Sequence, residues 1–338
     1  MVVVVFKEVR DVGSNWARFE EAPVTIEVRW GSATHVGCVR TANQDAVLAG
    51  PVIFAVADGM GGHAAGEVAS AITVARLALL PANPTGEEVL AAVHEANTEV
   101  ISQGAPGTGR EGMGATLSGV ALATNAGREA LLIFNVGDSR TYLFDGSLLK
   151  QITEDHSLVA DMVRAGELGA AEARSHRGRN VITRAIGIAA EVTVDHWWID
   201  PLPGQVFLAC SDGLTNEVDV DELAAVLGAA ASPQQAVDVL VERALDAGAR
   251  DNVSAIAVFL DAVTNDIAVI EEDTNPTKKR GALVSPAPEV IDTVPGPRAD
   301  DGPGPSFPGD LVTGVPLLER DGRDDGVPAD LGSEGQGR

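Results

Sequence analysis

Cysteine is almost absent from this chain of 338 residues, in which only Cys38 and Cys210 occur. Neither has a neighbour at the spacing of zinc ligands, and two isolated cysteines form no disulfide framework. Aromatic residues are also scarce, at 4%, whereas apolar residues make up 45% of the chain. That apolar fraction is normal for a globular protein, so we expect a core of aliphatic side chains, with Cys210 inside it. The low cysteine content excludes a disulfide scaffold and favours a reducing compartment.

Basic residues are far fewer than acidic ones. The 24 Lys and Arg residues against 49 Asp and Glu residues give a formal net charge of -25. Such a charge repels nucleic acid and anionic membranes and attracts cations. Long hydrophobic runs are missing as well: residues 1–6 are apolar but too short to cross a bilayer, and no later run approaches about 18 residues. We therefore expect a cytoplasmic protein with no membrane span and no nucleic-acid partner.

Three regions of the chain differ in texture. Residues 1–24 are a mixed N-terminal extension of unknown role, and residues 25–262 alternate strand-like and helix-like patterns. Residues 263–338 are rich in Pro and Gly, acidic and without periodicity, which predicts a disordered tail. The basic cluster at residues 278–280 is read either as part of a solvated linker or as a docking point for a partner.

Strands are predicted where apolar residues run without interruption, as in strands buried on both faces. Such runs are found at residues 51–57, 130–136 and 205–210, and residues 252–260 form a last strand. A hairpin is predicted around the turn Asp145-Gly146.

Helices are predicted from apolar stripes and from capping residues. One stripe holds Val68, Ala71, Ile72, Ala75 and Leu79, and a second holds Val89, Val93, Ala96 and Val100. A further helix has Ser232 as N-cap, Pro233 after it, Gln235 closing a capping box and Gly248 beyond its end. The grouping of strands and helices favours antiparallel sheets with helices packed outside.

Aspartates lie next to the predicted buried strands. Asp58 and Asp212 each follow such a strand and precede a glycine, Asp138 follows the strand ending at Val136, and Asp251 precedes the last strand. Carboxylates gathered at strand ends repel one another unless a divalent cation lies between them, and all-oxygen ligands suit Mg²⁺ or Mn²⁺. The alternative is that these aspartates serve only as turn residues, as Asp-Gly pairs elsewhere in the chain do.

Two further segments favour the metal site. Arg40 stands five residues before Asp45, just ahead of the first buried strand, and a glycine-rich stretch runs from Gly59 to His63. Glycines there allow backbone groups to approach a metal or a phosphate closely. Taken alone, Arg40 is equally read as half of a surface ion pair, and His63 as an ordinary loop histidine.

An ordered set of motifs over about residues 30–262 resembles the bacterial branch of the metal-dependent protein phosphatases, the protein phosphatase 2C or PPM family. Each motif is weak alone, but the complete order is specific. The motifs span residues 40–45, 57–63, 112–116, 135–140, 153–157, 180–187, 211–214 and 250–254.

The resemblance implies two bound Mn²⁺ or Mg²⁺ ions, with a third, weaker one. Asp58 would bridge the two ions, and Gly59 would offer its backbone carbonyl to one of them. Asp212 and Asp251 would complete the shell of the other ion, and Asp45 would support the carbonyl-bound ion, partly through water.

The remaining implied roles concern the third ion and the substrate. Asp138, with Asp212, would hold the third ion, Arg40 would bind the phosphoryl oxygens, and His63 would protonate the departing oxygen. Residues 156–187 would form a mobile flap beside the site.

The fold implied is α+β, a four-layer α-β-β-α sandwich of two antiparallel sheets flanked by helices. The function implied is hydrolysis of phosphoserine and phosphothreonine in proteins by a metal-bridged hydroxide, reversing bacterial Ser/Thr kinases, so the partners would be these kinases and their phosphorylated substrates. We expect a monomer. Two alternatives stay open: a non-catalytic module that senses phosphoproteins or metal, and a phosphatase dedicated to one regulator, such as a phosphorylated sigma-factor antagonist.

Overall fold

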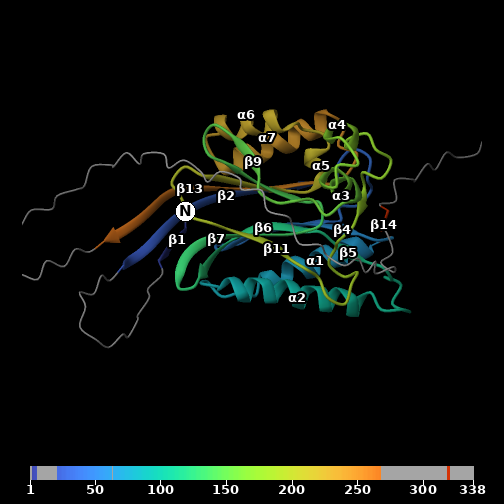
Figure 1. The fold of residues 1–338 in the computed structure, drawn as a ribbon, viewed down its shortest axis with the longest axis horizontal. Helices are drawn as coiled ribbons and strands as arrows, with labels where there is room; N and C mark the ends of the chain where they lie inside the picture. The colour runs from blue at the N-terminus through green and yellow to red at the C-terminus, as the bar shows by residue number, and fades with distance from the viewer. Residues whose placement is uncertain (1, 6–20, 63, 268–317, 320–338) are drawn as a thin grey trace, which may run out of the picture.

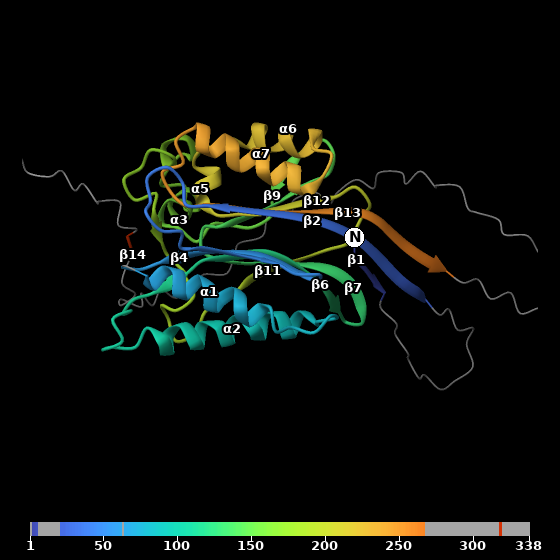
Figure 2. The same cartoon turned by 180° about the vertical axis from the view of Figure 1, so that it is seen from behind.

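The computed structural model describes residues 2–5, 21–62, 64–267 and 318–319. Two antiparallel sheets lie face to face, and each is covered on its outer side by helices, which gives four layers (Figures 1 and 2). The predicted α+β sandwich is therefore confirmed. The basic cluster at residues 278–280 and most of the predicted tail lie outside the described residues.

The first sheet is built around the long pairing of its second and third strands, and all its pairings are antiparallel. Its strands, in spatial order, are β1 (Val2–Val5), β2 (Glu21–His35), β13 (Val253–Ile267), β12 (Val206–Cys210), β8 (Arg140–Phe144) and β9 (Leu149–Gln151). The last two form the predicted hairpin, in which the Asp145 carboxylate accepts hydrogen bonds from the N–H groups of Ser147 and Leu148.

The second sheet packs against the first, and a strand of two residues pairs with the end of one of its strands. Its order is β11 (Asp195–Ile199), β7 (Arg128–Val136), β6 (Leu117–Asn125), β4 (Ile53–Met60) and β3 (Asp45–Ala49), with β5 (Gly114–Ala115) paired to the end of β4. The outer helices are α1 (Ala65–Leu77) and α2 (Gly86–Gln103) on this sheet, and α6 (Val220–Ala229) and α7 (Pro233–Asp246) on the first.

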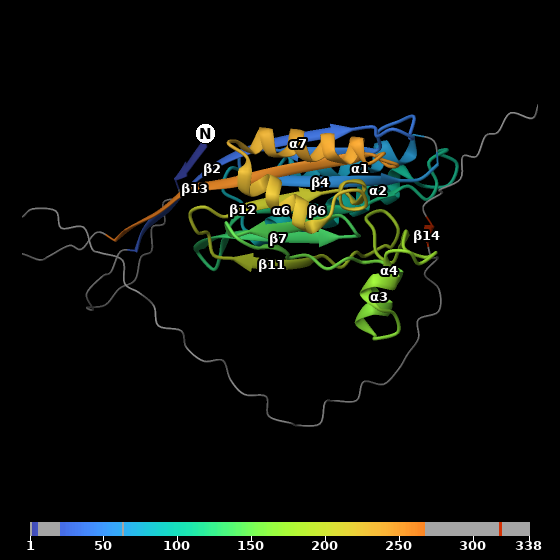
Figure 3. The ribbon, with the colours of Figure 1, turned by 90° about the horizontal axis from the view of Figure 1, so that it is seen from above.

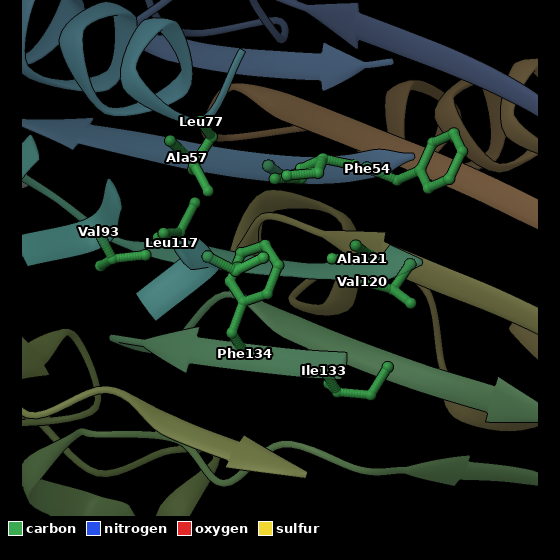
Figure 4. Packing of buried hydrophobic residues seen from close by; sticks show 14 of the residues in the cluster. Phe54, Ala57, Leu77, Val93, Leu117, Val120, Ala121, Ile133 and Phe134 are labelled. Atoms are coloured by element: carbon green, nitrogen blue, oxygen red, sulfur yellow. The ribbon is translucent and has the colours of Figure 1, made fainter. Parts of the chain in front are cut away.

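The larger hydrophobic core fills the space between the sheets and beneath α1 and α2. Figure 4 shows Phe54 from β4, Leu117 from β6 and Phe134 from β7 in this cluster, with Val93 of α2 beside them. All four side chains are fully buried, and burying one such side chain stabilises the fold by about 1.5–3 kcal/mol. A second cluster lies under α6 and α7 and includes Cys210, as predicted.

Helix α1 differs from the prediction in its buried face and in its end. It ends at Leu77, and Leu79 is 75% exposed. The buried face carries small and polar residues, among them Gly66, Ser70 and Thr73, because the helix backbone approaches β4 closely. Of the predicted stripe, Val68 and Ile72 are half-buried against the core, whereas Ala71, Ala75 and Leu79 are exposed, so the predicted buried face is wrong.

The second predicted stripe is confirmed as the buried face of α2. Val89, Val93, Ala96 and Val100 of α2 are fully buried, and Thr85 and Glu88 form a complete capping box at its start. At α7, Ser232 caps Gln235 N–H, but Gln235 Oε1 accepts from Ala231 N–H. The second half of the predicted capping box at α7 is therefore wrong.

The excursion that joins β9 to β11 contains three short elements, of which the two helices stand to one side of the sandwich (Figure 3). They are α3 (Leu158–Arg164), α4 (Ala170–Ala173) and β10 (Val181–Ile182), and β10 pairs with β14 (Leu318–Glu319). All three elements lie within the predicted flap at residues 156–187.

The sheets extend beyond the predicted domain limits of residues 25 and 262, and the first sheet includes β1 at residues 2–5. β2 begins at Glu21, and β13 continues to Ile267. Within the described residues, no helix has the length and apolarity needed to span a bilayer.

Candidate active site

Asp58 lies inside β4, whereas its sequence predicts a position directly after the strand. β4 continues to Met60 because β5 pairs with Gly59 and Met60 and so extends the ladder. The Asp58 N–H donates to Thr116 Oγ1 at 3.0 Å, and its carbonyl accepts from the Thr116 N–H at 2.9 Å. Asp58 is 7% exposed and lies directly opposite Asp45 in the pairing of β3 with β4. Two of the predicted ligands are thus held side by side.

Gly59 occupies a position that no larger residue could take. A Cβ at Gly59 would lie 2.1 Å from the carbonyl oxygen of Gly66 and 2.5 Å from that of Gln44. Its N–H donates to the Gln44 carbonyl at 3.1 Å, and Ser70 Oγ donates to the same carbonyl at 2.6 Å. This close contact joins α1, β4 and the start of β3 beside Asp58.

Asp212 and Asp251 lie on neighbouring segments, the short helix α5 (Asp212–Thr215) and the residues before β13, which are in contact. A Cβ at Gly213 would lie 2.0 Å from the Asn252 carbonyl oxygen and 3.5 Å from Asp251 Cβ. Asp212 is 8% exposed. The two aspartates come from segments 39 residues apart and are brought together by this glycine contact.

The loop that carries Arg40 is fastened by Asn252. Its side-chain amide donates to the carbonyls of Val36 and Ala42, both at 2.9 Å, and its Oδ1 accepts from the Gln44 N–H at 2.8 Å. Arg40 itself pairs with Asp251, with Nε 3.0 Å from Oδ1 and Nη2 3.1 Å from Oδ2. The ion-pair reading of Arg40 is therefore correct, and its partner is one of the predicted ligands.

Buried hydroxyl groups connect the remaining aspartates. Ser211 Oγ donates to Asp45 Oδ2 at 2.8 Å and accepts from the Ser254 N–H at 3.0 Å. Ser139, which follows Asp138, shares a hydrogen bond of 2.7 Å between its Oγ and Thr116 Oγ1. Asp138 is 6% exposed. The five predicted carboxylates thus belong to one connected region at the ends of strands from both sheets.

Oxygen donors dominate this region, and their chemistry fits hard divalent cations. Three of the five carboxylates, those of Asp58, Asp138 and Asp212, are more than nine-tenths buried. Neighbouring buried carboxylates are costly unless a cation offsets their charge, and oxygen ligands are those that Mg²⁺ and Mn²⁺ prefer. As placed, no three His, Cys, Asp or Glu side chains among the described residues close into a coordination shell. His63 lies outside the described residues.

Sequence reasoning gave no role to the residues that connect the aspartates: Thr116, Ser211 and Asn252. Each lies inside a motif that carries the family resemblance, and its place in that motif is the one sign in the sequence that it belongs to the site. Spacing could not reveal the contacts themselves, because they join residues such as Asp58 and Thr116, or Gln44 and Asn252, that are far apart in the chain.

Comparison with known proteins agrees with this fold. Residues 39–247 match the model of the family described as protein phosphatase 2C. The serine/threonine phosphatase Stp of Listeria monocytogenes is 36% identical over 219 residues, which cover 62% of this chain and 85% of that protein. The serine/threonine protein phosphatase PstP of Mycobacterium tuberculosis is 36% identical over 318 residues, covering 88% of this chain and 60% of that protein.

Solved structures give the same result. The crystal structure of M. tuberculosis PstP superposes with a TM-score of 0.64 at 36% identity and covers 70% of this chain and 100% of that chain. The catalytic domain of PstP in complex with two manganese ions has a TM-score of 0.63 at 34% identity, and covers 71% of this chain and all of that one.

An α-β-β-α sandwich that superposes on solved serine/threonine phosphatases at 34–36% identity places the chain in the class of protein phosphatases. More narrowly, because the family model matches more than half of its residues, the chain belongs to the protein phosphatase 2C family.

Proposed function

We propose that this protein hydrolyses phosphoserine and phosphothreonine in other proteins with the help of Mn²⁺ or Mg²⁺, and so reverses Ser/Thr kinases. The observation that carries the proposal is the connected group of buried aspartates at the sheet ends. The names of the relatives support the substrate class, and the two manganese ions in a PstP structure support the choice of metal.

Five side chains and one backbone carbonyl are the proposed metal-binding groups. They are Asp45, Asp58, Asp138, Asp212, Asp251 and the carbonyl of Gly59. Bound ions would supply Lewis acidity, lower the pKa of a bound water and offset the charge of the phosphoryl group. The close packing of Gly59 against Gly66 and Gln44 fixes the backbone beside Asp58 for this role.

Arg40 is the proposed phosphate-binding residue. Its guanidinium group carries five N–H donors, and the contacts with Asp251 engage only Nε and Nη2. The side chain is 36% exposed and can therefore present its other donors to the phosphoryl oxygens of a bound substrate. The pairing with Asp251 keeps this cation next to the carboxylates.

His63 is proposed as the general acid that protonates the departing serine or threonine oxygen. An alkoxide is a poor leaving group, so a positioned acid typically accelerates such a step by about 10²–10⁴-fold. The segment before His63 is set by the end of β4 at Met60, two residues after Asp58.

The test is release of phosphate from a phosphothreonine peptide with and without Mn²⁺. We expect Mn²⁺-dependent turnover that Asp58→Asn and Asp251→Asn abolish. Asp145→Asn is the matched control, because Asp145 also precedes a glycine but lies in the β8–β9 turn. Turnover that persists in both site variants, or that Asp145→Asn also abolishes, would exclude the proposed roles. A protein that binds Mn²⁺ without turnover would instead be a sensing module.

A further inference from the structure

A buried histidine stands at the start of the excursion that carries α3, α4 and β10. His156 is 3% exposed and makes two hydrogen bonds with Gly137. The Gly137 N–H donates to His156 Nδ1 at 2.9 Å, and the His156 N–H donates to the Gly137 carbonyl at 3.0 Å. The residue after Gly137 is Asp138, so His156 holds the backbone next to a proposed metal-binding carboxylate.

The other edge of the imidazole faces a charged pair. His156 Nε2 lies 3.0 Å from Asp195 Oδ2, and Arg184 Nη1 lies 2.5 Å from Asp195 Oδ1. Because Nδ1 accepts a hydrogen bond, the proton of the neutral ring is on Nε2 and is donated to Asp195. Arg184 Nη1, 2.9 Å from Nε2, then also donates to the Asp195 carboxylate rather than to the ring.

The pKa shifts agree with this arrangement. Burial, together with the nearby Arg184 charge, lowers the pKa of His156 and favours the neutral ring, against the opposing effect of Asp195. Burial alone would raise the pKa of Asp195, but the hydrogen bonds from His156 and Arg184 lower it overall. The carboxylate therefore stays charged and holds both donors.

Backbone contacts of His156 and the residue after it close the base of residues 157–183, which we call the flap segment. The Thr183 N–H donates to the His156 carbonyl at 2.9 Å, and Ser157 forms an antiparallel bridge with Ile182. Three residues beyond Thr183, Ile186 pairs with Ala115. Both ends of the flap segment are thus tied at one point, next to the site.

The exit of the flap segment is also connected to β4. Ala115, the partner of Ile186, is in turn paired with Gly59. Gly187 cannot shift freely, since a Cβ there would lie 2.3 Å from Val100 Cγ1, and its N–H donates to Asn97 Oδ1 at 2.7 Å. The flap segment therefore meets the proposed metal-binding residues through Gly137 on one side and Ala115 on the other.

We propose that His156, held by Asp195, to which Arg184 also donates, is a positioning residue that couples the conformation of the flap segment to the placement of the Asp138 carboxylate. The coupling runs through the two hydrogen bonds between His156 and Gly137. Gly137 transmits it because its backbone has φ +103° and is packed so tightly that a Cβ would lie 2.6 Å from Thr116 Cγ2. The metal-binding role of Asp138 on which this inference depends rests on the proposed function.

The test is limited trypsin digestion of the full chain, with cleavage after Arg174, Arg177 and Arg179 followed by mass spectrometry. These arginines are exposed within the flap segment. Asp195→Asn removes the negative charge that accepts hydrogen bonds from His156 and Arg184. We expect cleavage of this variant to be about tenfold faster than that of the wild type, because loss of one charge-assisted hydrogen bond in a partly solvated site has an effect of that size.

Asp261→Asn is the matched control. Asp261 also pairs with an arginine, Arg29, and the two ion pairs are similarly exposed. The side chains of Arg29 and Asp261 are 39% and 29% exposed, and those of Arg184 and Asp195 are 33% and 31% exposed. Asp261 lies on β13, outside the flap segment, so its variant should leave flap cleavage within twofold of the wild type. Equal acceleration in both variants would overturn the proposal.

The coupling itself is tested by adding Mn²⁺, because linkage between two sites is reciprocal. Mn²⁺ should slow flap cleavage of the wild type several-fold, after correction with a peptide substrate of trypsin. Asp138→Asn and Asp195→Asn should lose this protection. His156→Asn, which keeps an acceptor near Nδ1 but lacks Nε2, should behave like Asp195→Asn.

The outcomes separate this inference from the proposed function. If Mn²⁺ does not protect the wild-type flap segment, or protects Asp195→Asn equally, the coupling is wrong even when the phosphopeptide is hydrolysed. Cleavage of Asp195→Asn at the wild-type rate would show that the three residues do not hold the flap segment. A wild type that is inactive on the phosphopeptide would instead contradict the proposed function.

Discussion

Thr116→Val is expected to weaken metal binding by removing one hydroxyl group behind Asp58. Thr116 is fully buried, and its Oγ1 accepts from the Asp58 N–H at 3.0 Å and shares a hydrogen bond of 2.7 Å with Ser139 Oγ. Valine keeps the shape but provides no acceptor. Loss of these contacts should cost about 1–2 kcal/mol of unfolding free energy, or about 2–8 °C in Tm for a domain of this size.

Thr141→Val separates the loss of stability from the effect on metal binding. Thr141 is equally buried, and its Oγ1 shares a hydrogen bond of 2.9 Å with Ser118 Oγ rather than with the backbone of an aspartate. We expect both variants to lower the Tm of the metal-free protein by similar amounts. Only Thr116→Val should raise the Mn²⁺ concentration needed for half-maximal phosphate release, by about tenfold if one hydrogen bond of positioning is lost.

The Mn²⁺ requirement would be measured by titrating phosphate release from a phosphothreonine peptide at a temperature well below both melting points. An equal rise in the Mn²⁺ requirement of Thr116→Val and Thr141→Val would refute the idea that Thr116 acts through Asp58. An unchanged requirement in Thr116→Val, despite a lower Tm, would refute it as well.

Three other predictions follow from particular residues. Burial raises the pKa of Glu129 from 4.5 to about 7, so the folded protein binds this proton more tightly than the unfolded chain, and stability falls as pH rises from about 4.5 through 7. Because Glu129 is only half-buried, its ionisation at pH 8 lowers the unfolding free energy by about 1–2 kcal/mol. Glu129→Gln should therefore raise the Tm by a few degrees at pH 8 but not at pH 4, and equal shifts of the Tm at both pH values would contradict this. His63→Ala should reduce turnover of alkyl phosphates far more than that of p-nitrophenyl phosphate, whose leaving group needs no proton, and equal losses would exclude the general-acid role. A chain ending at Ile267, the last residue of β13, should keep its peptide turnover, whereas a sharp loss would show that the tail contributes to catalysis.

Local patterns in the sequence predicted much of the fold. The apolar run that became β7 and the Asp-Gly turn between β8 and β9 depend on neighbours in the chain, and both are confirmed. The stripe of α2 is also confirmed, because a helix that packs with large side chains shows its buried face as a periodic pattern. The buried face of α1 was predicted wrongly because it combines small and polar residues, such as Gly66, Ser70 and Thr73, with Leu77, a mixture that shows no apolar period.

For the site, the sequence could indicate the residue types but not the connections. Aspartates next to buried runs were recognisable, although pairing with β5 placed Asp58 inside a strand instead of after it. The ion pair of Arg40 with Asp251 joins residues that are 211 positions apart. The contact of His156 with Asp195 likewise forms only when the excursion returns to β11. Such contacts depend on the tertiary fold, and spacing carries no sign of them.

The central claim is that the buried aspartates hold the metal ions, and crystals grown with Mn²⁺ test it most directly. Anomalous difference maps measured near the manganese edge should show two strong peaks that share Asp58, with Asp212 and Asp251 beside one of them. In crystals of Asp58→Asn, both peaks should weaken or vanish. Manganese peaks located away from these aspartates, or peaks that are unchanged in Asp58→Asn, would contradict the account.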